Sequence, residues 1–160
     1  MDSKEQQFTS LILEHKSIIY MVCYMFTGDK DEIDDLSQDI LVKLWKGYDS
    51  FAGRSDIKTW IYRVSLNHCI DAGAKKKRRG EKVPLTTDID VASGADDKAM
   101  QTQLLYSRIN SLGLVDRGII LLWLEGLSYD EIADIVGMTA GNISVRLMRI
   151  KEQLKQKSNK

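Results

Sequence analysis

The sequence predicts an all-α protein in which a flexible acidic linker joins two small helical domains. Apolar residues recur at helical spacing through most of the 160 residues, and no stretch alternates as a strand would. Residues 128–154 carry the capping and turn signals of two consecutive helices. Residues 81–97 hold the only proline and no sustained helical period. With 43% apolar residues, the chain has enough hydrophobic side chains to bury both cores.

Three helices are expected before the linker. The first covers residues 8–26, where apolar side chains repeat at helical spacing. The second covers residues 31–46, with acidic residues in its first turn and lysines in its last, as the helix dipole favours. The third begins at Ser55 or Asp56 and continues into the basic run 75–79.

The second half follows the linker at 81–97. Apolar periodicity predicts helices over residues 104–112 and 115–124, beneath a C-terminal helical hairpin. We therefore expect domains at 1–80 and 98–160.

The hairpin is the most informative segment of the chain. Ser128 is expected to cap its first helix, with Glu131 completing a capping box. Gly137 supplies the positive φ of a tight turn, and Thr139 caps the second helix. One stripe of that helix then faces the core: Ile143, Leu147, Ile150 and Leu154.

The opposite side of the second helix forms a candidate DNA-reading face. Such a helix enters the major groove, with some side chains near base edges and basic ones near phosphates. The candidate residues are Asn142, Ser144, Val145, Arg146, Met148, Arg149 and Lys151. The alternative is an ordinary helical hairpin with a solvated basic face.

Charge is strongly segregated although the total is neutral. Residues 1–50 carry a net charge of −5, residues 51–80 of +6, residues 81–137 of −6 and residues 138–160 of +5. Two positive zones suggest two nucleic-acid contacts and leave the acidic surfaces for protein partners.

Other classes of function find little support. No phosphate-binding glycine loop, nucleophile constellation or metal-ligand spacing is present, so we expect no catalytic residue, no cofactor and no metal. Cys23 and Cys69 fall in apolar helical patterns and are expected to be free, buried thiols. No apolar run is long enough to span a membrane, and the N-terminus does not read as a signal peptide, so we expect a cytoplasmic protein without membrane insertion.

The order of these parts resembles the extracytoplasmic-function (group IV) sigma factors of bacterial RNA polymerase. The resemblance covers nearly all of the chain outside the linker. It is carried by DLSQD at 35–39, LW at 44–45, Phe51, TWIYRV at 59–64, Asn67, Asp71 and GLSYDEIA at 126–133. It implies that the two halves are sigma region 2-like and sigma region 4-like, the latter with the helix-turn-helix.

The resemblance implies a protein partner for the acidic helix. In this family the equivalent face grips the clamp helices of core RNA polymerase, and here it carries Asp35, Gln38, Asp39 and Val42. An acidic, amide-bearing face suits a basic partner. The alternative is a solvated face on which Asp39 pairs with Lys43.

The resemblance further implies that residues 51–58 and the helix after them read the minus-ten promoter element. This involves a base flipped out of the stack. The candidates are Arg54, Ser55, Lys58, Arg63, Asn67, Lys75, Lys76, Lys77, Arg78 and Arg79. Trp60 is favoured as a core residue rather than a base-stacking one, and Asn67 has an alternative role in bonding within its domain.

The C-terminal hairpin would then read the minus-thirty-five element. Ser144 and Met148 stand where relatives often have a basic and an aromatic residue, so base preference does not transfer. The implied partners are core RNA polymerase, promoter DNA and an anti-sigma factor. Two rivals are an operator-binding regulator that acts without polymerase and an adaptor that binds protein through its acidic face.

Overall fold

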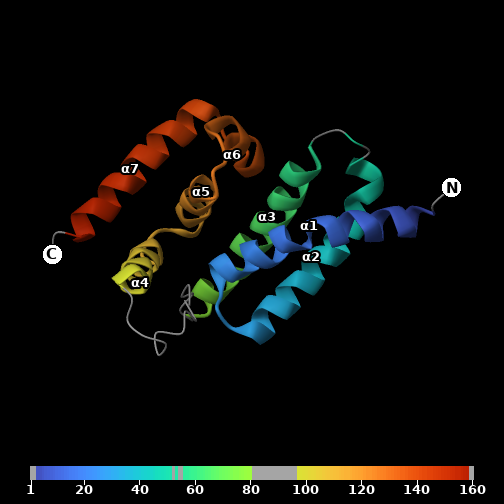
Figure 1. Cartoon of the computed structure of the whole chain (residues 1–160), viewed down its shortest axis with the longest axis horizontal. Coiled ribbons are helices and arrows are strands. Elements are labelled where there is room, and N and C mark those ends of the chain that lie inside the picture. Colours follow the sequence, from blue (N-terminus) through green and yellow to red (C-terminus); the bar gives the residue numbers. More distant parts are fainter. Residues whose placement is uncertain (1–2, 52, 54–55, 81–96, 159–160) are drawn as a thin grey trace.

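The computed structural model describes residues 3–51, 53, 56–80 and 97–158. Within them every regular element is a helix, as the sequence predicts (Figure 1). The seven helices are α1 Lys4–Phe26, α2 Lys30–Phe51, α3 Ile57–Arg78, α4 Asp97–Ile109, α5 Leu114–Leu124, α6 Tyr129–Val136 and α7 Ala140–Ser158. No helix in the described part of the chain is long and apolar enough to cross a membrane.

Helices α1, α2 and α3 pack on one another as the first domain. Their core contains Val22 from α1, Ile40 and Leu44 from α2, and Ile61 from α3, none of which is exposed. Burial of side chains of this size stabilises by about 1.5–3 kcal/mol each. The rigid three-helix unit therefore holds the outer faces of α2 and α3 in a fixed orientation.

Helix α5 is the centre of the second domain, because buried residues follow one another through most of its length. Helix α7 packs on it through the predicted stripe, of which Ile143, Leu147 and Ile150 are buried and Leu154 is half-buried. The opposite side of α7 is thereby left toward solvent.

The turn between α6 and α7 has the predicted geometry. The Ser128 hydroxyl accepts a hydrogen bond from the Glu131 N–H at 3.1 Å, and the Glu131 carboxylate accepts one from the Ser128 N–H at 3.0 Å. Gly137 has φ +83°. The Thr139 hydroxyl accepts from the Asn142 N–H at 3.1 Å and caps α7. These local bonds fix the angle at which α7 leaves the hairpin.

The two domains meet along α3, which also contacts α5 and α6 (Figure 1). Leu66 of α3 is 1% exposed and lies against Gly118 of α5, where an added Cβ would stand 3.0 Å from a Leu66 methyl carbon. Gly118 therefore permits the close approach of the two helices.

Several helix boundaries differ from the sequence prediction. Helix α2 continues past residue 46 to Phe51, because side chains of its last turns pack within the domain. The Tyr48 ring lies edge-on to Phe8 at 5.3 Å, and the Phe51 ring stacks on Trp60 at 4.5 Å. Asp97, expected in the linker, begins α4, and residues 81–96 of the linker lie outside the described residues.

We expect Gly137→Ala to lower the free energy of unfolding by about 1–2 kcal/mol, because an L side chain is strained at this positive φ. No atom of the described residues would obstruct the new methyl group, so the loss would come from the backbone alone. Urea unfolding followed by circular dichroism measures it. Gly141→Ala, inside α7, is the matched control and should instead stabilise by about 0.5–1 kcal/mol. Equal effects of the two substitutions would contradict this reading of the turn.

Candidate nucleic-acid and partner interfaces

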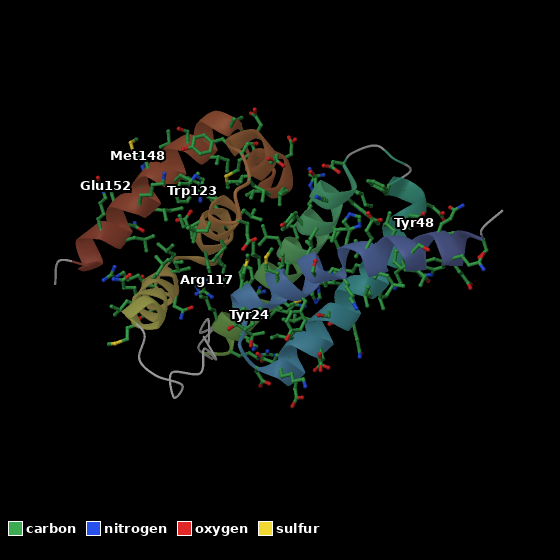
Figure 2. The ribbon with its side chains drawn as sticks, viewed as in Figure 1. Tyr24, Tyr48, Arg117, Trp123, Met148 and Glu152 are labelled. Atoms are coloured by element: carbon green, nitrogen blue, oxygen red, sulfur yellow. The ribbon has the colours of Figure 1, made fainter. Side chains whose placement is uncertain are left out.

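Most of the predicted reading face of α7 is exposed. Asn142, Ser144 and Arg149 are exposed, and the apolar members Val145 and Met148 are 41% and 63% exposed. Figure 2 shows Met148 on the outer side of α7 and Trp123 of α5 on its inner side. The geometry therefore offers a row of small, amide, apolar and basic groups that a DNA groove could accept.

Two basic residues of this candidate set are partly held by α5. Arg146 Nη1 lies 2.9 Å from Asp116 Oδ1, and Lys151 Nζ lies 3.9 Å from the centre of the Trp123 ring. Both contacts join α7 to the helix beneath it. Arg146 and Lys151 thus orient α7, whereas Arg149 projects from the exposed side.

An aromatic contact joins the last residue of α2 to the first turn of α3. The Phe51 and Trp60 rings stack with an interplanar angle of 16°, and both are half-buried. This packing agrees with the core assignment of Trp60. Lys58 and Asn67 are exposed on α3, while Arg54 and Ser55 lie outside the described residues.

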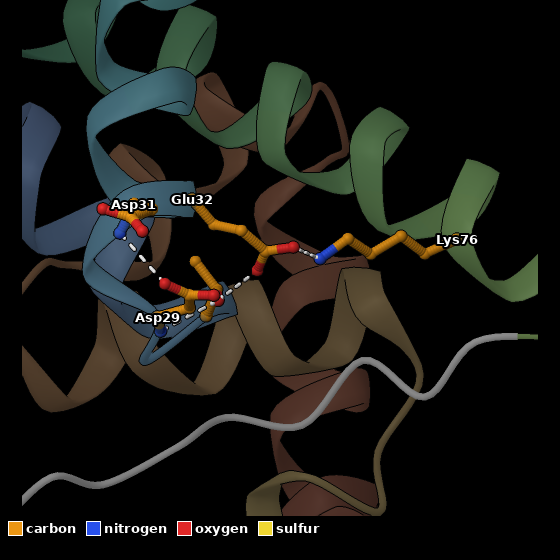
Figure 3. A network of polar contacts seen from close by, with 5 residues as sticks. Asp29, Asp31, Glu32 and Lys76 are labelled. Carbon is orange, nitrogen blue, oxygen red and sulfur yellow. Dashed lines mark hydrogen bonds and ion pairs between the residues drawn. The ribbon is translucent and has the colours of Figure 1, made fainter.

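The basic run at the end of α3 divides into two kinds of side chain. Lys75, Lys77, Arg78 and Arg79 are exposed near the helix C-terminus, where the dipole favours cations. Lys76 instead reaches back to the Glu32 carboxylate of α2 (Figure 3). The Thr27 hydroxyl donates to the same carboxylate at 2.5 Å. Hydrogen bonds from Lys76 and then Thr27 lower the pKa of Glu32.

The acidic face of α2 is exposed, as the partner interpretation requires. Asp35, Gln38 and Asp39 are exposed, and Val42 is 51% exposed. His68 of α3 places Nε2 3.4 Å from Asp39 Oδ2. Burial and the nearby Lys43 lower the pKa of His68, which leaves the imidazole neutral at pH 7. The neutral imidazole therefore adds no positive charge beside the Asp39 carboxylate.

Arg63, a candidate contact to the minus-ten element, is bonded to the second domain in this structure. Its side chain is exposed, yet its Nε donates to the Asp134 carbonyl oxygen at 3.1 Å, near the end of α6. The adjacent Tyr62 is buried, and its pKa is raised by burial and by Glu125 and Glu131 of the second domain. Helix α6 therefore occupies part of the surface of α3.

Sequence reasoning missed Glu32, His68 and Asp134 as neighbours of candidate residues. Each lies on a different helix from the residue it contacts, so no spacing along the chain signals the pair. Among the described residues, no group of three or more histidine, cysteine or acidic side chains is arranged to hold a metal ion.

Two known protein families match this architecture. The model of Sigma-70 region 2 matches residues 11–79, and that of Sigma-70, region 4 matches residues 102–154. The chain belongs to the extracytoplasmic-function sigma factors of the sigma-70 family. These proteins act in transcription initiation and are not enzymes.

Individual relatives agree with this assignment. SigW of Bacillus subtilis is 27% identical over 167 residues, covering 95% of this chain and 89% of SigW. The sigma-E factor of Escherichia coli is 28% identical over 173 residues, covering 96% and 87%. SigG of Mycobacterium tuberculosis is 32% identical over 88 residues, but the match spans only 55% of this chain and 23% of SigG.

Two solved structures have the same fold. RpoE of Bartonella quintana, in complex with the anti-sigma factor NepR, superposes with a TM-score of 0.73 and 25% identity, covering 94% of this chain and 95% of RpoE. CnrH in complex with the cytosolic domain of CnrY gives a TM-score of 0.71, 20% identity and coverage of 98% and 90%.

We expect Lys76→Met to lower the free energy of unfolding by about 1 kcal/mol, because it removes a half-exposed ion pair between α2 and α3. The folded-state pKa of Glu32 is lowered, so its contribution is present above the unfolded pKa and is lost as the pH falls through the folded one. The difference between the urea midpoints of wild type and variant should therefore stay constant from pH 7 down to about pH 5 and shrink only as the pH falls below about 4.

Lys77→Met, one position further, is the control for this substitution. Lys77 is exposed and should leave stability within about 0.5 kcal/mol. A loss of stability as large as that of Lys76→Met would show that the contact with Glu32 is not what distinguishes the two lysines.

Proposed function

We propose that this chain is a cytoplasmic sigma factor that binds core RNA polymerase and directs it to promoters. A first domain at residues 1–80 contacts polymerase and the minus-ten element, and a second at 98–160 contacts the minus-thirty-five element. The observation that carries this proposal is the exposed side of α7, presented by a capped helix-turn-helix while its apolar stripe is buried.

The polymerase contact is assigned to the exposed face of α2. Asp35 and Asp39 supply negative charge, Gln38 an amide, and Val42 an apolar contact. Charge of one sign on a rigid helix steers association with a basic surface, and the apolar group adds area once the surfaces meet. The neutral His68 beside Asp39 leaves that charge available.

The minus-ten contact is assigned to residues 51–58 and to exposed side chains of α3. Flipping a base out of the stack costs a few kcal/mol, which a pocket and phosphate contacts offset. The stacked Phe51 and Trp60 hold the end of α2 against the start of α3. Lys58, Asn67, Lys75, Lys77, Arg78 and Arg79 are exposed for such contacts, whereas Lys76 mainly holds α3 to α2.

The similarity to RpoE bound to NepR and to CnrH bound to CnrY supports a further partner. We infer that an anti-sigma factor binds this chain as well.

A reconstituted transcription assay with core polymerase and no other sigma factor tests the proposal. A promoter-dependent transcript supports it. Tight operator binding by the chain alone without a transcript would favour the operator-binding regulator. Binding to a protein partner with neither DNA binding nor transcription would favour the adaptor.

Replacing both Asp35 and Asp39 by lysine should weaken core polymerase binding at least about tenfold, because the charge of the contact face is reversed. Fluorescence anisotropy of a labelled chain titrated with core enzyme measures this. Glu14→Lys, an exposed charge reversal on α1, is the control and should bind as wild type does. Circular dichroism checks that all variants remain folded. Unchanged affinity of the double variant would overturn the interface assignment.

Arg149→Ala should weaken binding to the minus-thirty-five element by about 1–3 kcal/mol if Arg149 reads a base, with relaxed preference at one base pair. If Arg149 contacts a phosphate, the loss would be uniform across sequences and the salt dependence shallower by about one charge. Binding of a panel of single-base variants by the holoenzyme at several salt concentrations separates these outcomes. Arg108→Ala, on α4, is the control.

A further inference from the structure

Cys23 of α1 and Cys69 of α3 form a buried thiol pair that the proposed function does not use. Their exposed fractions are 0% and 1%, and both are free cysteines. The two thiols lie on packed helices and are near enough for each to shift the pKa of the other. A third helix joins them, because the Ser37 hydroxyl of α2 donates to Cys23 Sγ at 3.6 Å. Neighbouring thiols on two packed helices can pair as a disulfide once one of them is oxidised.

A small cavity gives one of these thiols a route to solutes. It has a volume of about 90 Å³ and is lined by Cys69 together with Phe26, Leu36, Ala72 and Gly73. Its polar wall is the Thr27, Glu32 and Lys76 network of Figure 3. A water-sized molecule needs about 10–15 Å³ of such space, so a small hydroperoxide fits. Cys23 does not line the cavity.

We propose that Cys23 and Cys69 are an oxidant-responsive pair that closes to a disulfide between α1 and α3 when a small hydroperoxide enters the cavity at Cys69. The class of reactant follows from the size of the cavity and from the chemistry of thiols, which hydroperoxides oxidise in two steps.

In the first step Cys69 Sγ attacks the outer peroxide oxygen, the O–O bond breaks, and the thiol proton goes to the departing oxygen as an alcohol, or as water when the oxidant is hydrogen peroxide. Cys69 becomes a sulfenic acid. In the second step Cys23 Sγ attacks the Cys69 sulfur, the S–O bond breaks, and hydroxide leaves with the Cys23 proton as water. Two thiols and one hydroperoxide thus give one disulfide, one alcohol and one water.

The acidities of the two thiols favour the second step and slow the first. The hydrogen bond from Cys69 lowers the pKa of Cys23, which favours Cys23 as the nucleophile of the second step. The hydrogen bond with Cys23 and burial raise the pKa of Cys69. A thiol of raised pKa reacts slowly, so the cross-link should need sustained oxidant rather than a brief pulse.

Closure would connect the ends of a long loop. Residues 24–68 lie between the cysteines and contain all of α2, the helix assigned to polymerase binding. Closing such a loop restricts the unfolded chain and stabilises the fold. The oxidised first domain would therefore resist unfolding under the conditions that oxidise it.

The test uses the full chain treated with hydrogen peroxide, alkylated, and analysed by intact mass and peptide mapping. We expect a loss of about 2 Da with the Cys23 and Cys69 peptides linked, and a melting temperature raised by at least about 5 °C until a reductant is added. Cys23→Ala and Cys69→Ala should each abolish both changes. Intermolecular dimers, over-oxidation of a single cysteine, or no reaction in the folded chain would overturn the proposal.

The role of the cavity is tested separately. Cumene hydroperoxide is too large for it and should oxidise the folded pair at least about tenfold more slowly than hydrogen peroxide, whereas the urea-unfolded chain should not discriminate in this way. Ala72→Val narrows the cavity without replacing either thiol and should slow the reaction with hydrogen peroxide. Equal discrimination in the folded and unfolded chains would show that the cavity is not the route. These readouts do not involve polymerase, so they stand or fall independently of the proposed function.

Discussion

The structure depends most on the double packing of α3. This helix forms the first core with α1 and α2, and it also receives α5 and α6 of the second domain (Figure 1). Its buried residues serve both contacts: Ile61 belongs to the core of the first domain, and Leu66 lies against Gly118 of α5. The side chains assigned to DNA are therefore confined to the strip of α3 that neither neighbour covers.

Local signals explain why the hairpin could be predicted residue by residue. Ser128, Glu131, Gly137 and Thr139 act on backbone groups within a few positions, so the sequence spacing determines their partners. The length of α2 could not be predicted in this way. Residues 47–51 remain helical because Tyr48 and Phe51 find aromatic partners on other helices, and such contacts exist only once the domain has formed.

The basic run at residues 75–79 shows that contacts between helices in the candidate site were equally unpredictable from the sequence. Lys76 and Lys77 are identical in type and adjacent in sequence, but successive helix positions point about 100° apart. One consequently meets Glu32 and the other faces solvent. The net charge of the segment predicted that this end of α3 attracts nucleic acid. It could not show which of the basic side chains form ion pairs within the fold. Arg146, which pairs with Asp116, illustrates the point again in α7.

DNA that binds α3 competes with the second domain for part of the surface of this helix. Arg63 is bonded to the Asp134 carbonyl, and it could exchange this neutral acceptor for a phosphate, which forms the stronger, charge-assisted bond. Separating α3 from α5 and α6 would expose Leu66 and more of Tyr62, and full burial of a large apolar side chain is worth about 1.5–3 kcal/mol. One phosphate bond does not offset the loss of both. A partner that binds the two domains apart must supply the difference, and only differential affinity for the separated arrangement can do so.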